Sequence, residues 1–215
     1  MIKFLFILAL TLLIPFDAKV SFDRNEKSVA TPAFKFNSIP SPSSHDAASK
    51  AKLTLIDGVM DGGSGDLAAL IDGRVPKDED DPGGNFYFRA GSFGGRFRMD
   101  LGSAIDIVSV NSYSWHPNTR GPQLYKLYAA DGADPKFVLD PKRWTDPATV
   151  GWTFIATVST LPERGSEGGQ YGVVVKNPQG SLGKYRYLLF DCYVTELNDD
   201  WGNTFYSEID VVEKK

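Results

Sequence analysis

The chain contains one cysteine, Cys192, among 215 residues, so it can form neither a disulfide framework nor a multi-cysteine metal site. It also lacks a basic excess. Its 23 Lys and Arg face 27 Asp and Glu, which gives a net charge of −4 and argues against a nucleic-acid partner. After residue 16 no apolar run approaches the roughly 20 residues that cross a bilayer, so no transmembrane segment is predicted.

The common catalytic motifs are absent as well. The sequence has no Gly-x-Ser-x-Gly, no His-Glu-x-x-His and no phosphate-binding loop that ends in Gly-Lys-Ser/Thr. The glycine-rich stretch 91–95 lies between predicted strands, without a following helix to bind phosphate. The sequence does not exclude a pair of carboxylates that hydrolyses a glycosidic bond, because two such acids can come from any loops. We predict that the protein is not an enzyme.

The N-terminal 50 residues differ in composition from the rest. Lys3 precedes an unbroken apolar run from Phe4 to Phe16, a pattern typical of a secretory signal peptide. We therefore predict a signal peptide over 1–20, with cleavage between 18 and 21, and a secreted, extracytoplasmic protein. Residues 21–50 mix charges with the Ser- and Pro-rich stretch 38–44 and show no sustained periodicity, which predicts a flexible spacer.

From residue 51 to residue 215, short alternating runs are separated by Gly, Pro, Asp and Asn. Phe97, Met99 and Leu101 alternate with polar residues, and 152–158 alternates with Trp152, Phe154, Ala156 and Val158 on one face. One short helical turn is expected within 64–70. With no βαβ alternation, the pattern predicts an all-β domain, a single antiparallel β-sandwich. The predicted strands are 96–101, 105–115, 123–130, 152–158, 171–175, 185–194 and 208–212.

Three stretches, read in order, resemble the discoidin and coagulation-factor C-type domains, which are galactose-binding-like jelly rolls and include bacterial carbohydrate-binding modules. The first joins Ala69–Gly73 to 97–102 and 107–110. The second is 124–132 followed by Trp152, and the third is 184–188 with the closing segment 207–211. The resemblance covers residues 51–213. It implies the fold more strongly than any function, because this fold carries many functions.

The resemblance also implies one structural Ca²⁺ site, with Asp72 and Glu208 as side-chain ligands and backbone carbonyls from Arg74 onward. Carboxylates and loop carbonyls are the oxygen ligands that Ca²⁺ takes. The sequence departs from the family here, because an acidic loop, 74–84, replaces a short loop that ends in tryptophan. The alternative is a solvated acidic turn in which Asp72 only caps the backbone.

The strongest candidate for recognition is the segment 113–121, where a strand ends in aromatic residues and enters a loop bounded by Pro and Gly. Sugar recognition uses planar donors and acceptors for hydroxyl groups and an aromatic face for the ring. In carbohydrate-binding relatives the corresponding loop supplies a His and an Arg, which the resemblance assigns to His116 and Arg120. Both side chains are expected to point out of the end of the sandwich. The predicted ligand-binding residues are Tyr113, Trp115, His116, Asn118, Arg120 and Trp201.

Three of these assignments have structural alternatives. Trp115 could be a core residue, and Arg120 could form a surface ion pair. Trp201 lies in a polar loop before the last strand, where a stacking role and a structural role are equally consistent with the sequence. Trp144, in the insertion 140–147, is expected to pack that loop onto the body. Cys192 falls on an apolar face and is expected to be a buried, inert thiol.

These features predict an exported, non-catalytic carbohydrate-binding module with a structural calcium site and a glycan or glycoconjugate as partner. The first alternative is a protein–protein adhesion module on the same fold. The second alternative, binding of anionic lipid, fits the sequence less well, because the loop around Trp201 is acidic. A binding loop for anionic lipid would carry exposed apolar residues with basic flanks.

Overall fold

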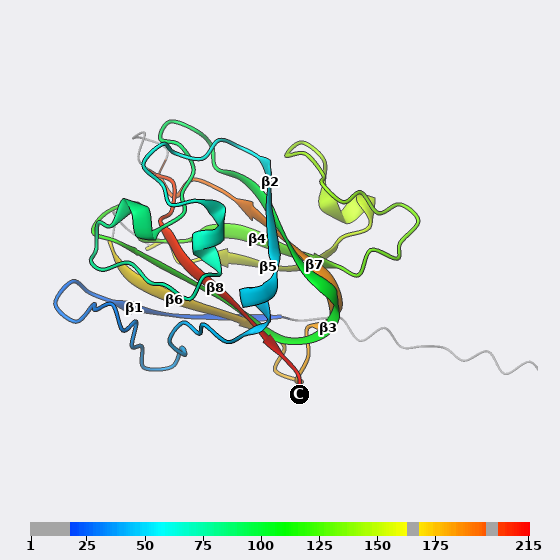
Figure 1. Ribbon diagram of the computed structural model, residues 1–215, viewed down its shortest axis with the longest axis horizontal. Helices are drawn as coiled ribbons and strands as arrows, with labels where there is room; N and C mark the ends of the chain where they lie inside the picture. The colour runs from blue at the N-terminus through cyan, green and yellow to red at the C-terminus, as the bar shows by residue number, and fades with distance from the viewer. Residues whose placement is uncertain (1–17, 163–167, 197–201) are drawn as a thin grey trace, which may run out of the picture.

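The computed structural model describes residues 18–162, 168–196 and 202–215. Within these ranges every pairing between strands is antiparallel, and the only helical elements are short 3₁₀ turns (Figure 1). The strands are β1 (Lys19–Asn25), β2 (Lys52–Asp57), β3 (Gly95–His116), β4 (Leu124–Ala130), β5 (Thr153–Ser159), β6 (Gly169–Lys176), β7 (Gly183–Cys192) and β8 (Tyr206–Glu213). The 3₁₀ turns are η1 (Ala47–Lys50), η2 (Leu67–Leu70), η3 (Pro82–Gly84) and η4 (Pro147–Val150).

The 22-residue strand β3 belongs to both layers of the sandwich. Its first half pairs with β2 and β7, and its second half pairs with β6 and β8. The register with β7 shifts between Asp100 and Ile105, and Gly102 there has a φ of +82°, which only glycine adopts readily. Strands that switch sheets through such bends form the corners of a sandwich. The predicted all-β sandwich is confirmed, and the strands expected at 96–101 and 105–115 are one bent strand.

The core lies between the two layers. Phe97 and Met99, predicted to share a face, are both fully buried there, and the thiol of Cys192 is buried beside them as expected. The predicted alternation in β5 is wrong in part. A register shift opposite Leu127 and Tyr128 leaves Phe154 45% exposed, while Ala156 and Val158 remain in the core. The bulge reverses the face of every residue on one side of it.

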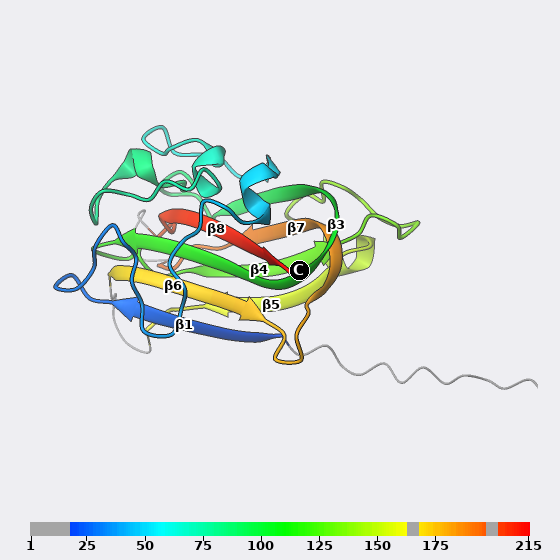
Figure 2. The same ribbon diagram turned by 60° about the horizontal axis from the view of Figure 1, so that its bottom comes forward.

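Residues 21–50 are not a flexible spacer, and that prediction is wrong. Strand β1 pairs along its whole length with β6, and the two lie side by side at one edge in Figure 2. The segment that follows covers the outer face of the layer that contains β6, β8 and the second half of β3. Phe34 is fully buried there, and Ile39 is 5% exposed. Composition misled the prediction because a few apolar side chains, spaced without any period, suffice to dock an irregular segment on a sheet that already exists.

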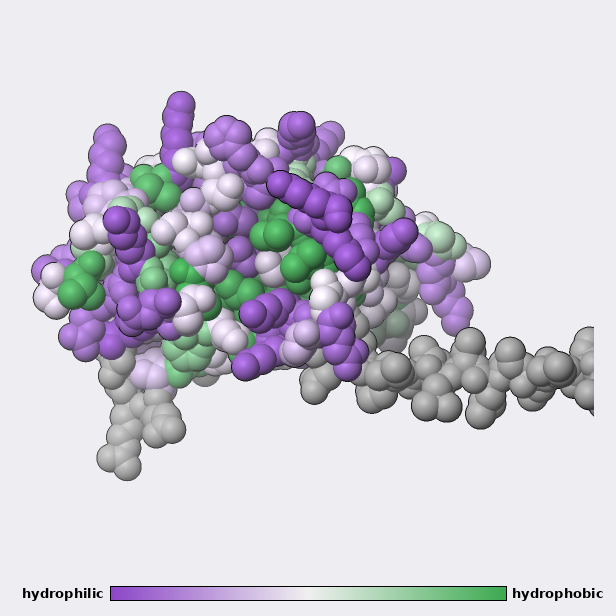
Figure 3. All heavy atoms as spheres, turned by 90° about the horizontal axis from the view of Figure 1, so that it is seen from below, coloured by the Kyte–Doolittle hydropathy of each residue, from purple (hydrophilic) through white to green (hydrophobic). Residues whose placement is uncertain are grey.

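The signal peptide predicted over 1–20 lies mostly outside the described residues, except that β1 begins at Lys19. No helix among the residues described has the length and hydropathy needed to cross a membrane. Figure 3 shows the protein from below, the side on which β1 lies in Figure 1. Apolar side chains in the middle of this face are bordered by hydrophilic ones, as is usual for the surface of a globular protein.

Arginines of β3 help to hold the long connection between β4 and β5, residues 131–152, whereas Trp144 does not. The Arg96 guanidinium is buried and donates to the carbonyls of Lys142 and Thr145 at 2.9 and 2.8 Å. Arg98 Nε donates to Asp140 Oδ1 at 2.8 Å. Trp144 is 96% exposed, so the expectation that it packs the loop onto the body is wrong.

Candidate functional site

One end of the sandwich gathers polar and aromatic groups from three segments that lie far apart in the sequence. His116 is the last residue of β3, and Arg120 lies in the turn that follows. Tyr87 comes from the long connection between β2 and β3, and Phe205 immediately precedes β8. The Tyr87 and Phe205 rings stack with centroids 4.0 Å apart. Because β3 and β8 are antiparallel neighbours, the end of one strand lies beside the start of the other.

Arg120 lies against this aromatic pair. Its Cζ lies 4.9 Å from the centroid of the Tyr87 ring and 4.7 Å from that of Phe205, within the range of cation–π attraction. The residue is only 5% exposed, and burial lowers the pKa of its guanidinium. The expectation that Arg120 points outward from a solvated loop is therefore wrong: its guanidinium is covered by the aromatic pair.

His116 is the polar side chain through which this cluster meets the surface. Its ring contacts the Phe205 ring edge-on at 4.6 Å, and its side chain is 12% exposed. Burial lowers the His116 pKa to about 4, so the imidazole is neutral at physiological pH. The Asn118 N–H donates to Nδ1 at 3.1 Å, which leaves the proton on Nε2, 3.9 Å from Asp80 Oδ1. The site thus combines a neutral imidazole donor with an exposed carboxylate acceptor.

Tyr113 and Trp115 do not belong to this cluster, so the structure does not bring these two predicted ligand-binding residues together with His116. Both lie beneath the N-terminal segment, 0% and 5% exposed, where Phe34 contacts both rings edge-on. The Tyr113 hydroxyl donates to the carbonyl of Pro40 at 2.8 Å. Successive side chains of a strand point to opposite faces, so Trp115 and His116 cannot share one.

Asn118, the other predicted residue of this loop, is exposed beside His116. Trp201 lies outside the described residues. Tyr87, Phe205 and Asp80 are parts of the cluster that the sequence did not predict. Asp80 was expected only as part of the acidic loop 74–84. Their positions depend on how the loops converge, which no local pattern reveals.

The two predicted calcium ligands are neighbours. Asp72 is exposed and its Oδ1 accepts from the Arg74 N–H at 2.8 Å, as the capping alternative expected. Glu208 is 1% exposed, and its Oε2 has no hydrogen-bond partner. Burial first, then the carboxylates of Asp210 and Asp72, raise the pKa of Glu208 to about 9. A buried, unpartnered carboxylate oxygen near a second carboxylate fits a cation.

A cation at Glu208 would still need further ligands. In the described ranges, no three His, Cys, Asp or Glu side chains are placed so as to hold a metal by themselves. Calcium takes six to eight oxygens, and carbonyls of the turn at Gly73 or water molecules would have to complete the set. Gly73 has a φ of +70°, which folds this turn tightly and fits the requirement for a close backbone approach.

Comparison with known proteins shows the fold. No protein-family model matches the chain, and neither does any curated protein. Among solved structures, "GH31 CBM32-2 bound to GalNAc" matches with a TM-score of 0.50 and 11% identity, over 77% of this chain and 98% of that one. A histidine mutant of the lectin binding domain of lectinolysin, complexed with Lewis b, matches with a TM-score of 0.50 and 11% identity, over 80% and 99%. The chain shares the β-sandwich fold of these two domains, as the resemblance predicted.

Proposed function

We propose that the protein is a non-catalytic carbohydrate-binding domain whose ligand site lies at the end of the sandwich around His116. The observation that carries this proposal is the convergence of a neutral imidazole, an exposed carboxylate and an exposed amide at one edge of a fixed aromatic cluster. His116 would donate through Nε2, Asp80 would accept, and Asn118 would do both. Arg120 positions the cluster through the Tyr87 and Phe205 rings.

This arrangement suits sugar hydroxyl groups, because each hydroxyl both donates and accepts a hydrogen bond. Neutral His116 keeps its single donor throughout the physiological pH range, since its pKa is about 4. The aromatic rings underneath are 3% and 1% exposed for Tyr87 and Phe205, so they fix the polar groups instead of meeting solvent. Polar groups held in place before binding lose less entropy when the ligand arrives.

Substitution of His116 should weaken glycan binding without unfolding the protein. Loss of a hydrogen bond that leaves a partner unpaired costs about 1–3 kcal/mol, which corresponds to about tenfold or more in affinity. We expect His116→Ala to show this loss on the best ligand of a glycan array, measured by titration calorimetry. Asp80→Asn should have a similar effect, because it removes a charged acceptor while keeping the shape of the side chain.

The other histidine provides the control. His45 is exposed and lines a hollow with Glu213, at the opposite end of β8 from Phe205, so His45→Ala should bind like the unmodified protein. Circular dichroism melts would show that each variant is folded. A folded protein that binds no glycan on the array, or a His116→Ala variant with normal affinity, would contradict the proposal. The first result would favour the adhesion alternative, for which the exposed Trp144 is the most prominent apolar contact, and the second would place the glycan site elsewhere.

We further propose one structural calcium ion, held by Glu208 and Asp72 with backbone carbonyls. A bound Ca²⁺ would neutralise the buried carboxylate of Glu208 and tie the 72–74 turn to β8. The unpartnered Oε2 of Glu208 supports this proposal. Any ion that binds only the folded state stabilises it by about 2.7 kcal/mol at a hundredfold excess over Kd.

Removal of calcium should therefore lower the melting temperature by roughly 5–10 °C for a domain of this size, measured with and without EDTA. Glu208→Gln should abolish this sensitivity, because it removes the buried charge and keeps the shape of the side chain. Asp72→Asn should reduce it while still accepting from the Arg74 backbone. Glu213→Gln, on the exposed end of β8, is the control and should respond to EDTA normally. If EDTA does not change the melting temperature of the unmodified protein, the calcium proposal is wrong and Asp72 only caps a turn.

We also propose that the protein is exported. The basic residue and apolar run before residue 17 support this. Cleavage after Ala18 would leave β1 complete, because that strand starts at Lys19. Cleavage at the far limit of the predicted range would remove the first residues of β1, so we place the cut after Ala18.

A further inference from the structure

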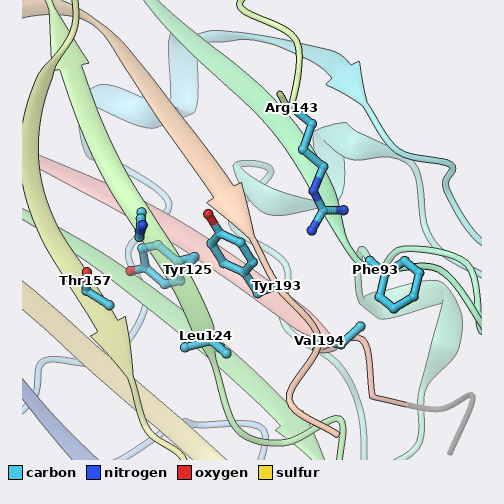
Figure 4. A pocket seen from close by; sticks show the side chains of 8 residues that line it. Phe93, Leu124, Tyr125, Arg143, Thr157, Tyr193 and Val194 are labelled. Atoms are coloured by element: carbon cyan, nitrogen blue, oxygen red, sulfur yellow. The ribbon is translucent and has the colours of Figure 1, made fainter. Parts of the chain in front are cut away.

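A hollow lies on the outer face of the β7–β4–β5 layer, and none of the residues that line it belongs to the His116 cluster. It has a volume of about 430 Å³, within the range of small-molecule sites. Figure 4 shows Tyr193 at its centre, Phe93 and Arg143 on one side and Thr157 on the other. None of the lining residues is acidic. The hollow is therefore built from aromatic, aliphatic and basic side chains and the neutral Thr157.

The aromatic walls are held in place before any ligand binds. The Tyr193 hydroxyl donates to Asp191 Oδ2 at 2.6 Å, and the buried Asp191 is itself paired with Arg96 at 2.8 Å. On the other wall, Asn203 Nδ2 donates to the carbonyls of Arg89 and Ser92, which fixes the loop that carries Phe93. The Phe93 ring is nevertheless 69% exposed, so its apolar face is available to a ligand.

Two cations flank the Tyr193 ring. Arg143 Cζ lies 5.6 Å and Lys126 Nζ 5.9 Å from the ring centroid. Among the described residues, neither side chain forms an ion pair with a carboxylate. The closest acids are engaged elsewhere: Asp57 accepts from the Arg143 backbone N–H at 3.0 Å, and Asp191 is paired with Arg96. The hollow therefore carries two cations without an ion pair among the described residues, although the Asp57 charge also acts on Arg143.

We propose that this hollow is a second binding site, for a ring-shaped organic anion with one flat apolar face. The carboxylate would lie between Arg143 and Lys126, and the apolar face of the ring would pack on Phe93 and Tyr193. Uronic acid residues of acidic glycans and simple aromatic carboxylates both carry this chemistry. Charge-assisted hydrogen bonds to arginine are the strong ones, so the anionic group should dominate affinity. This site does not depend on the sugar site at His116.

The test is a titration of ¹⁵N-labelled protein with an oligogalacturonate and, separately, with benzoate. We expect saturable shifts of the backbone amides near Phe93 and Tyr193 with at least one of the two probes. Response to oligogalacturonate identifies an acidic glycan as the source of the anion, and response to benzoate alone identifies an aromatic acid. A neutral galactose oligomer should not shift these amides, and raised salt should weaken binding of the anion.

Substitutions complete the test. Arg143→Gln and Phe93→Ala should each raise the Kd for the responsive probe about tenfold or more. Lys136→Gln, which replaces an exposed cation of the same connection between β4 and β5, should not change it. His116→Ala should leave this binding intact, which separates failure here from failure of the proposed function. Absence of saturable shifts with both probes, or a normal Kd in both Arg143→Gln and Phe93→Ala, would overturn the proposal.

Discussion

A chain that begins at residue 51 is expected not to fold stably. It would lose β1, which pairs with β6 over seven residues, and the side chains of Phe34, Ile39 and Ala48, which are at most 5% exposed. Burial of a side chain such as Phe or Ile contributes about 1.5–3 kcal/mol. The combined loss is comparable with the whole stability of an ordinary domain, about 5–15 kcal/mol.

The deletion would also break polar contacts between the N-terminal segment and β8. Asp46 Oδ1 accepts from the Val211 N–H at 2.8 Å, and Asp210 accepts from the Ser43 N–H at 3.2 Å. Thermal melts followed by circular dichroism, together with dye binding to exposed apolar surface, would measure the loss. A chain that begins at Ala18 is the control and should melt like the full chain. Retention of a cooperative melt at the same temperature by the chain 51–215 would show that this segment is dispensable.

Arg96→Leu is expected to cost about 3–5 kcal/mol, because it removes one partner of a buried ion pair. Arg96 Nε and Nη2 donate to Asp191 at 2.8 and 3.1 Å, and both residues are buried. The substitution would leave the Asp191 carboxylate without its counter-charge and would free the 141–145 segment from its donor. Urea denaturation and thermal melts should show this loss, with a fall in melting temperature of roughly 6–20 °C.

Arg186 provides the matched control. It forms the same two-bond pair with Asp100, at 2.8 and 3.0 Å, but on the surface. Arg186→Gln should change the melting temperature little, because solvent screens an exposed pair. The double variant Arg96→Leu with Asp191→Leu should recover part of the loss, since no unpaired charge then remains buried. Equal effects of Arg96→Leu and Arg186→Gln would show that burial of the first pair contributes nothing.

The sequence predicted the strands well where their side chains alternate. Phe97 and Met99 lie in the core as their period of two required, and Cys192 is buried on the apolar face of β7. Alternation failed at Phe154, where a bulge changes the register, and bulges depend on the neighbouring strand. The segment 21–50 was missed because its few apolar residues follow no period that could be recognised before the sheet beneath them exists.

The candidate site was predicted only in part, for a related reason. His116 and Asn118 lie where the end of a strand and its loop place them, so their sequence positions sufficed. Trp115 was grouped with His116 because the two are adjacent in sequence, although adjacent residues of a strand face opposite ways. The burial of Arg120 depends on Tyr87 and Phe205, which come from segments 33 and 85 residues away in the sequence.

The sequence by itself determined the class of fold, the lack of cysteine-based sites and the position of the loop that carries His116 and Asn118. These three properties follow from the composition and from the alternation of apolar and polar residues, which is visible within each segment by itself. Only the tertiary structure decided which side chains meet. The docking of residues 26–50, the burial of Arg120 and the basic hollow at Tyr193 all join segments far apart in sequence, and such contacts form only when the sheets have brought those segments together.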